Sequence, residues 1–93
     1  MAASERRDPG SSRGKGRARS LSDVTTGETV RIHLVDLPAD TAAWLAAVGL
    51  ERGEEVTVLR KAILGGPFHL RLARGGELTV ARDVAMRVAV EDA

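Results

Sequence analysis

The stretch WLAAVGLERGEEVTVLRKAILGGPFHLRL, residues 44–72, decides the fold that we predict for this chain. It begins with the end of an alanine-rich helix, since a glycine at position 49 suits the left-handed residue that follows many helices. Two runs of alternating apolar residues come next, and a glycine-proline corner at residues 63–67 separates them. The stretch therefore predicts a helix end, a strand, a corner and a second strand.

The helix before this stretch is predicted to start after Pro38, with Asp40 as its N-cap residue, and to run to about Val48. With Gly49 in the C′ position, a Schellman ending would place Leu45 against Leu50. Leu45, Val48 and Leu50 would then close one end of the domain.

Alternating apolar residues predict strands on both sides of the helix. Residues 28–36 form the first strand, with Val30, Ile32 and Leu34 inward. Residues 55–62 form the second, with Val56 and Val58 inward and Thr57 and Leu59 outward. The third strand directs inward three apolar side chains, Phe68, Leu70 and Leu72.

The pair Gly75-Gly76 predicts a two-residue primed turn into a fourth strand, whose inner face carries Leu78 and Val80. One tight helical turn is expected at residues 82–85. A fifth strand closes the chain, with inward side chains at Met86, Val88 and Val90.

Five short strands and one short helix in about 70 residues predict a mostly β fold, because closing the sheet removes its exposed edges. We expect a small SH3-like β-barrel, closed or nearly closed, over residues 21–93, with the helix between the first and second strands. The barrel is preceded by a basic tail at residues 1–20.

The tail and the domain differ in charge. Residues 1–20 hold six basic and two acidic side chains, whereas residues 21–93 hold eight basic and eleven acidic ones. The tail has almost no large apolar side chains, so we expect it to be disordered. Nonspecific binding to nucleic acid or acidic lipid is the alternative, but no aromatic residue is interleaved for base stacking.

The composition also restricts compartment and chemistry. The chain has no cysteine, which excludes disulfides and thiolate metal sites. No secretory signal or spanning segment is recognisable, so we expect a soluble, cytoplasmic protein. Every serine lies at or before Ser22 and tyrosine is absent, so a nucleophile, base and orienting group cannot be assembled in the domain. No phosphate-binding loop stands between a strand and a helix.

The order of several short motifs resembles the FeoA family, small cytoplasmic proteins of bacterial ferrous-iron transport. The matching positions are Leu21, Gly27, Leu45 to Leu50, Gly53, Ile63 to Pro67, Gly75-Gly76, and Arg82 with Ala85. The chain departs from the family at Ala42-Ala43-Trp44, where basic residues often precede the helix leucine.

The resemblance implies a non-catalytic accessory of the large membrane ferrous-iron transporter with a GTP-binding domain, FeoB. Such a protein would dock on the cytoplasmic part of the transporter and modulate it. The same domain occurs as the SH3-like C-terminal module of iron-dependent repressors, and the family is often linked to transition-metal binding. The alternatives are therefore a metal-binding or iron-regulator module, and, less favoured, a nucleic-acid-associated barrel.

Two histidines are the candidate ligands for Fe²⁺ or another divalent transition metal. His33 and His69 are both predicted on outward strand faces, with Asp36, Glu55 and Glu77 as carboxylate companions. Imidazole and carboxylate together suit Fe²⁺ or Zn²⁺. The spacing matches no established ligand pattern, and exposed strand histidines are commonly just solvated, so no metal site is assigned.

Apolar residues outside the predicted core are the candidate partner contacts. Leu59, Ile63 and Leu64 lie outward if the alternation holds, and Trp44 lies beside Leu45 on the helix. Exposed apolar side chains near a corner indicate a docking patch, in which tryptophan is a favoured anchor. The alternative is that Ile63 and Leu64 fold back over the barrel mouth while Trp44 caps the core.

Overall fold

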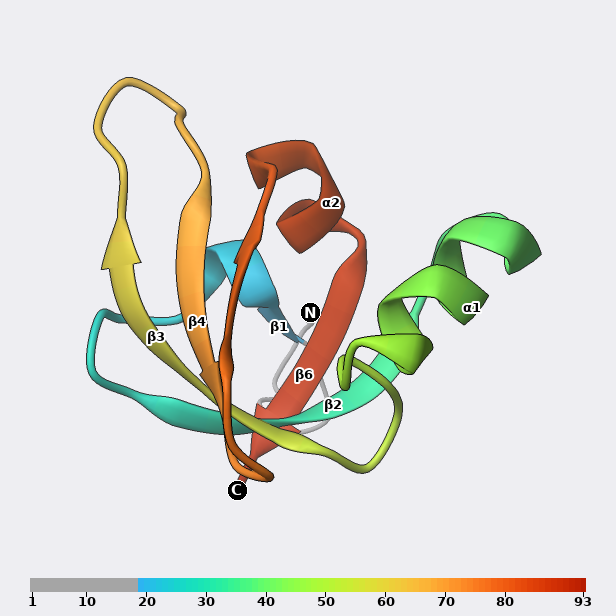
Figure 1. The fold of residues 1–93 in the computed structure, drawn as a ribbon. Helices are drawn as coiled ribbons and strands as arrows, with labels where there is room; N and C mark the ends of the chain where they lie inside the picture. Colours follow the sequence, from blue (N-terminus) through green and yellow to red (C-terminus); the bar gives the residue numbers. More distant parts are fainter. Residues whose placement is uncertain (1–18) are drawn as a thin grey trace, which may run out of the picture.

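An antiparallel sheet of six strands forms most of residues 19–93, the part of the chain that the computed structural model describes (Figure 1). The strands are β1 (Arg19–Ser20), β2 (Thr29–Val35), β3 (Glu55–Lys61), β4 (Phe68–Leu72), β5 (Glu77–Val80) and β6 (Val88–Asp92). A 3₁₀ helix, η1 (Leu21–Asp23), follows β1. Helix α1 (Ala39–Ala47) connects β2 to β3, and α2 (Arg82–Met86) connects β5 to β6.

The mostly β class is confirmed, but the sheet is open and has six strands, so the prediction of a five-stranded, closed or nearly closed barrel was wrong in these two respects. The strand order is β1-β6-β2-β3-β4-β5, and the two edge strands do not pair with each other. The edge strand β1 has only two residues, and the chain between β5 and β6 folds into α2, which packs against η1. Helical segments rather than strand pairing therefore cover this side of the curved sheet.

The sheet begins earlier than the boundary predicted at Leu21. Arg19 pairs with Val90 and Ser20 with Ala89, which adds β1 to the edge of β6. Disorder was predicted for residues 1–20, of which Arg19 and Ser20 form β1 and residues 1–18 lie outside the described residues. Among the described residues, no helix has the length and apolar character needed to cross a membrane.

The predicted inner faces of the strands are largely confirmed. Side chains at alternating positions on β3, β4 and β6 are almost fully buried and form one core with residues of β2 and η1. The core members include Val30, Ile32, Val56, Val58, Phe68, Leu70, Leu72, Val80, Val88 and Val90.

Two residues predicted to be inward are instead exposed. Leu34 is 51% exposed, because the register of β2 against β6 shifts between Ile32 and Leu34 and turns the following side chain outward. Met86 is 57% exposed, because it ends α2 instead of starting the last strand. Alternation cannot reveal an extra residue in a bulge or the last residue of a helix.

The end of α1 agrees with the prediction and its beginning does not. Leu50 donates its N–H to the Leu45 carbonyl (2.8 Å) and Gly49 donates to Ala46 (3.0 Å), which is the Schellman pattern, with Gly49 at φ +106°. Leu45 and Leu50 are buried, whereas Val48 is exposed. Pro38 occupies the N-cap position in place of the predicted Asp40, because the helix begins at Ala39, two residues earlier than an Asp40 cap implies.

The hairpin turns also differ from prediction. The Leu72 carbonyl accepts from Gly75 N–H (2.9 Å) and Leu72 N–H donates to the Gly76 carbonyl (3.0 Å), so residues 73–75 form the loop that the Leu72 and Gly76 backbones close. This is the longer hairpin connection that glycine in the left-handed region allows, not the two-residue primed turn predicted at Gly75-Gly76.

An ion cluster fixes the short edge strand β1. An Arg19 Nη lies 2.8 Å from Glu28 and 3.2 Å from Asp92, and the Thr25 N–H donates to Glu28 (3.1 Å). The hydrogen bond from Arg19, and then that from Thr25, hold the pKa of Glu28 below its ordinary value. The charged carboxylate is therefore favoured in the folded state.

This cluster predicts a loss of stability in acid. Because the folded-state pKa of Glu28 is depressed, its stabilising effect is present above the unfolded value and disappears as the pH falls through the folded value. The difference in unfolding midpoint between the native chain and Glu28→Gln should shrink as the pH falls from about 7 to about 3. Denaturant titrations across this range measure it. A difference that does not vary with pH would contradict this role of Glu28.

Candidate functional site

The β3–β4 hairpin extends past its strands into a two-residue turn that projects from the sheet. Ala62 N–H donates to the Pro67 carbonyl (2.9 Å) and Gly66 N–H to Ile63 (3.2 Å). Leu64 and Gly65, the two central residues, have φ values of +58° and +77°. Positive φ at both positions is the mark of a type I′ turn. We call residues 63–66 the hairpin tip.

Leu64 is an unusual residue for this position. A non-glycine residue in the left-handed region costs about 1–2 kcal/mol, and primed turns prefer Asn, Asp or Gly there. The Leu64 side chain is 98% exposed and Ile63 is 83% exposed, so neither fills the core. The two side chains therefore lie in solvent, outside the core and not folded over an end of the sheet.

Gly66 of the tip leaves no space for a Cβ atom, whereas Gly65 lies near the flexible end of the Arg82 side chain. A Cβ atom at Gly66 would lie 2.6 Å from the Ala62 Cβ, and one at Gly65 would lie 3.3 Å from Nη1 of Arg82. The backbone of the tip is thus packed closely on its own strand and on the first residue of α2.

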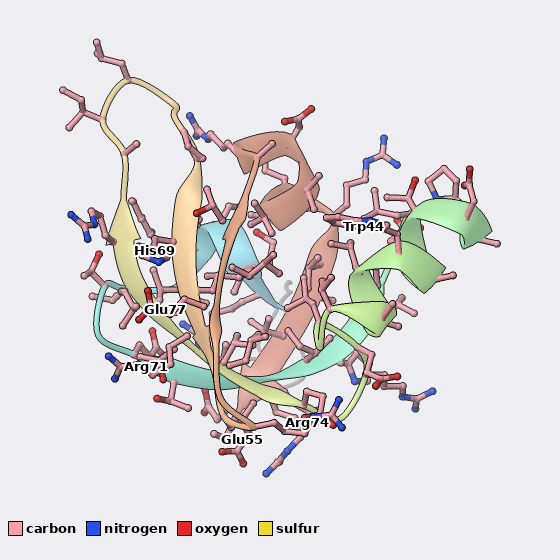
Figure 2. The ribbon with its side chains drawn as sticks, in the orientation of Figure 1. Trp44, Glu55, His69, Arg71, Arg74 and Glu77 are labelled. Atoms are coloured by element: carbon pink, nitrogen blue, oxygen red, sulfur yellow. The ribbon has the colours of Figure 1, made fainter. Side chains whose placement is uncertain are left out.

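The other two predicted contact residues lie elsewhere. Trp44 is 61% exposed on α1, which Figures 1 and 2 show on the opposite side of the molecule from the hairpin tip. Leu59 is half-buried, because the register of β3 against β4 shifts between Val58 and Arg60 and leaves it without a direct partner. The structure therefore groups Ile63 with Leu64 and does not bring Trp44 or Leu59 to the tip.

The two histidines do not come together. His69 Nε2 lies 2.7 Å from a carboxylate oxygen of Glu77, on the neighbouring strand β5, as Figure 2 shows. His33 Nδ1 lies 3.6 Å from Glu91, a residue not among the predicted companions. Within residues 19–93 no three His, Asp or Glu side chains gather in a way that could hold a metal ion. Each histidine thus has one carboxylate neighbour and no third ligand in the described part of the chain.

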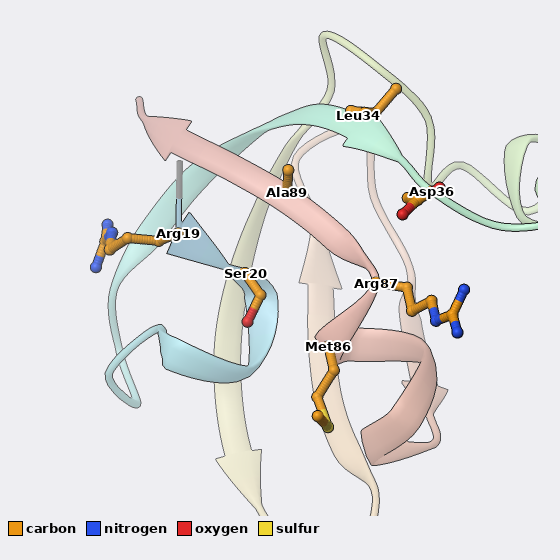
Figure 3. Close-up of a pocket in the computed structure, with 7 residues that line it drawn as sticks. All are labelled: Arg19, Ser20, Leu34, Asp36, Met86, Arg87 and Ala89. Carbon is orange, nitrogen blue, oxygen red and sulfur yellow. The ribbon is translucent and has the colours of Figure 1, made fainter. Parts of the chain in front are cut away.

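A shallow groove lies beside β6 and was not predicted. It has a volume of about 240 Å³, and Leu34 and Met86 contribute apolar side chains to it (Figure 3). The remaining lining residues are Arg19, Ser20, Asp36, Arg87 and Ala89. Its apolar part exists only because the bulge in β2 and the end of α2 turn Leu34 and Met86 outward, and the sequence alternation gave no signal for either.

Comparisons with known proteins agree with this architecture. The sequence profile of the FeoA domain matches residues 19–92. A FeoA protein from Chlorobium tepidum has a similar structure, with a TM-score of 0.73 and 30% identity over 78% of this chain and 69% of that one. A FeoA-like protein from Clostridium acetobutylicum gives a TM-score of 0.70 and 26% identity over 82% and 87% of the two chains.

A manganese-dependent transcriptional repressor shares the fold as well, with a TM-score of 0.74. Its identity is 18%, and the match covers 82% of this chain but 37% of the repressor, so the likeness concerns the fold of one part of that protein. A search of curated proteins finds no match. The profile match over residues 19–92 and the similar FeoA structures together show that the chain belongs to the FeoA domain family, which is involved in ferrous-iron transport.

Proposed function

We propose that this domain is a non-catalytic, cytoplasmic accessory of ferrous-iron transport. It docks on the cytoplasmic part of a membrane ferrous-iron transporter that carries a GTP-binding domain, of the FeoB type. Membership of the FeoA domain family supports the assignment to iron transport. The observation that carries the docking step is the exposure of Leu64 in a positive-φ position.

This observation favours docking because the apolar side chains of the tip bury little surface in the isolated domain. Leu64 occupies a costly backbone conformation and its side chain contacts almost nothing. Backbone strain of this kind persists where the surrounding structure fixes it, and it is often found at binding sites. Ile63 and Leu64 side by side form a small apolar projection that can enter a pocket on a larger partner.

A non-catalytic role is consistent with the chemistry of the described residues. The serines there, Ser20 and Ser22, lie within hydrogen-bonding distance of each other and not of a histidine. The two histidines each lie beside one carboxylate on the sheet surface. Within residues 19–93, neither serine therefore lies next to a histidine base that a third group orients.

Capture of the transporter tests this proposal. The nucleotide-binding cytoplasmic domain of the transporter is immobilised, and binding of the native chain and of Ile63→Asp is measured. Ile63→Asp should fold normally, because the side chain is exposed, and should bind roughly 30-fold more weakly, the effect of losing a contact worth about 2 kcal/mol.

Leu34→Asp is the matched control, since it places the same charge at another exposed apolar position. It should leave capture unchanged. Equal capture by folded Ile63→Asp would count against docking through the tip, and loss of capture by Leu34→Asp alone would move the interface to the groove beside β6.

Metal binding is the second candidate, and the 2.7 Å approach of His69 to Glu77 is the observation that favours it. An imidazole and a carboxylate supply two ligands for Fe²⁺. Anaerobic calorimetric titration with Fe²⁺ tests it on the native chain and on His69→Ala, with His33→Ala as control. A site built on this pair predicts heat that His69→Ala removes and His33→Ala retains. If the two variants titrate like the native chain, neither histidine is a ligand.

A further inference from the structure

A small pocket with two cationic side chains lies at the base of the hairpin tip. It has a volume of about 160 Å³ and is open to solvent. Its basic members are Lys61, the last residue of β3, and Arg82, the first residue of α2. The other lining residues are Ser22, Ala62, Gly65 and Phe68.

Contacts within the fold hold Lys61 in the pocket, and Arg82 lies close to the tip. Lys61 Nζ donates to the Ser22 carbonyl (3.2 Å) and lies 5.2 Å from the centre of the Phe68 ring, which is within the range of a cation–π contact. Arg82 lies under the tip, close enough to Gly65 that a Cβ there would be 3.3 Å from Nη1. The pocket therefore adjoins the tip, since Gly65 belongs to both.

Neither cation forms an ion pair within residues 19–93, where arginines at positions 19, 31 and 74 all do. Glu28, whose pKa the charge of Lys61 also lowers, is already held by Arg19 and by the Thr25 N–H. The described part of the chain contains more acidic than basic side chains, so two unpaired cations facing one pocket are a local departure from its overall charge.

We infer that this pocket receives a carboxylate of the docking partner, from a segment in which an acidic residue stands beside apolar ones. The carboxylate binds between Lys61 and Arg82, and the apolar residues cover Ile63 and Leu64. A guanidinium binds a carboxylate through two parallel hydrogen bonds, and a lysine ammonium adds a point charge. The inference rests on the proposed function for the identity of the partner, the cytoplasmic part of the transporter.

A protein segment fits this surface better than a free or lipid phosphate. The apolar tip lies directly beside the cations, so an occupant that covers both must be partly anionic and partly apolar over a short distance. A solvated phosphate would leave Ile63 and Leu64 exposed. A lipid surface would call for several basic side chains spread over one face, not two converging on one pocket.

Charge reversal in the pocket tests the inference with the full chain. Lys61→Glu and Arg82→Glu, each confirmed as folded by its thermal transition, should bind the immobilised transporter domain at least about tenfold more weakly. Their remaining binding should depend less on salt than that of the native chain. Arg82→Gln, which removes the charge without reversing it, should lose less affinity than Arg82→Glu.

Arg71→Glu is the matched control, because Arg71 is an exposed cation on β4 outside the pocket. It should bind like the native chain. If the native chain binds and the pocket variants bind as Arg71→Glu does, the inference is overturned and the proposed function stands. If the native chain itself does not bind the transporter domain, both the inference and the proposed function are overturned. Vesicles containing phosphatidylserine serve as the second probe. If the native chain binds these vesicles, the pocket variants do not, and all of them still capture the transporter domain equally, the pocket binds lipid and the inference is overturned.

Discussion

Replacing Leu64 by asparagine should make the domain more stable and a weaker binder. Asparagine tolerates the left-handed conformation that Leu64 adopts at φ +58°, and Asn-Gly is a preferred type I′ turn. The free energy of unfolding should therefore rise by about 1 kcal/mol. Because the substitution also removes the exposed apolar side chain, capture of the transporter domain should weaken by about tenfold or more.

Urea unfolding and a binding isotherm on the same preparation measure both effects of Leu64→Asn. Leu64→Gly is the companion variant, since glycine also adopts positive φ but raises the conformational entropy of the unfolded chain, which offsets the relief of strain. Both variants should bind the transporter domain weakly, whereas only Leu64→Asn should clearly raise the free energy of unfolding. An asparagine variant that is more stable and still binds with native affinity would show that the leucine is not a contact.

Leu70→Ala should have the largest effect on folding. Leu70 is fully buried at the centre of β4, paired with Val58 on one side and Leu78 on the other. Truncating a buried leucine costs about 2–5 kcal/mol, and a single core of this size supplies only about 3–5 kcal/mol. We therefore expect the variant to be largely unfolded at room temperature.

Circular dichroism and urea titration measure this effect. Leu34→Ala is the matched control, because it makes the same change at a position that is half exposed on β2, and its midpoint should shift much less. A native-like midpoint for Leu70→Ala would contradict the assignment of the core.

The strands and the helix end could be predicted because they depend on local patterns. Alternation at Val56, Val58 and Leu70 follows from burial of one strand face, and the ending of α1 follows from glycine at position 49. Both signals lie within a few residues of sequence, and the structure confirms both.

The features that were missed depend on distant contacts or on single extra residues. The pairing of Arg19 and Ser20 with β6 joins residues about 70 positions apart, and no local sequence pattern predicts it. The outward position of Leu34 depends on a one-residue shift between β2 and β6. The two-residue primed turn was expected at Gly75-Gly76 and lies instead at Leu64-Gly65. Leucine is rare at the first central position of such a turn, so the residue preferences of turns do not predict one there.

The candidate site was predicted only in part for the same reason. Alternation placed Ile63 and Leu64 outside the core, but it could not place Trp44, which α1 carries to the other side of the molecule. Lys61 and Arg82 line the same pocket, but they stand at the end of a strand and at the start of a helix, and no sequence motif links the two positions. Sequence periodicity indicates which side chains lie outside the core, but it does not indicate which of those side chains lie next to one another.

The most direct test of docking through the hairpin tip is a nuclear magnetic resonance titration of the isotopically labelled chain with the transporter's cytoplasmic domain. If the account is correct, the backbone amide signals that shift or broaden first belong to residues 61–66 and to Arg82, while those of Leu34, Met86 and Ala89 stay in place. Perturbation centred on that second group, or no perturbation at all, would contradict it.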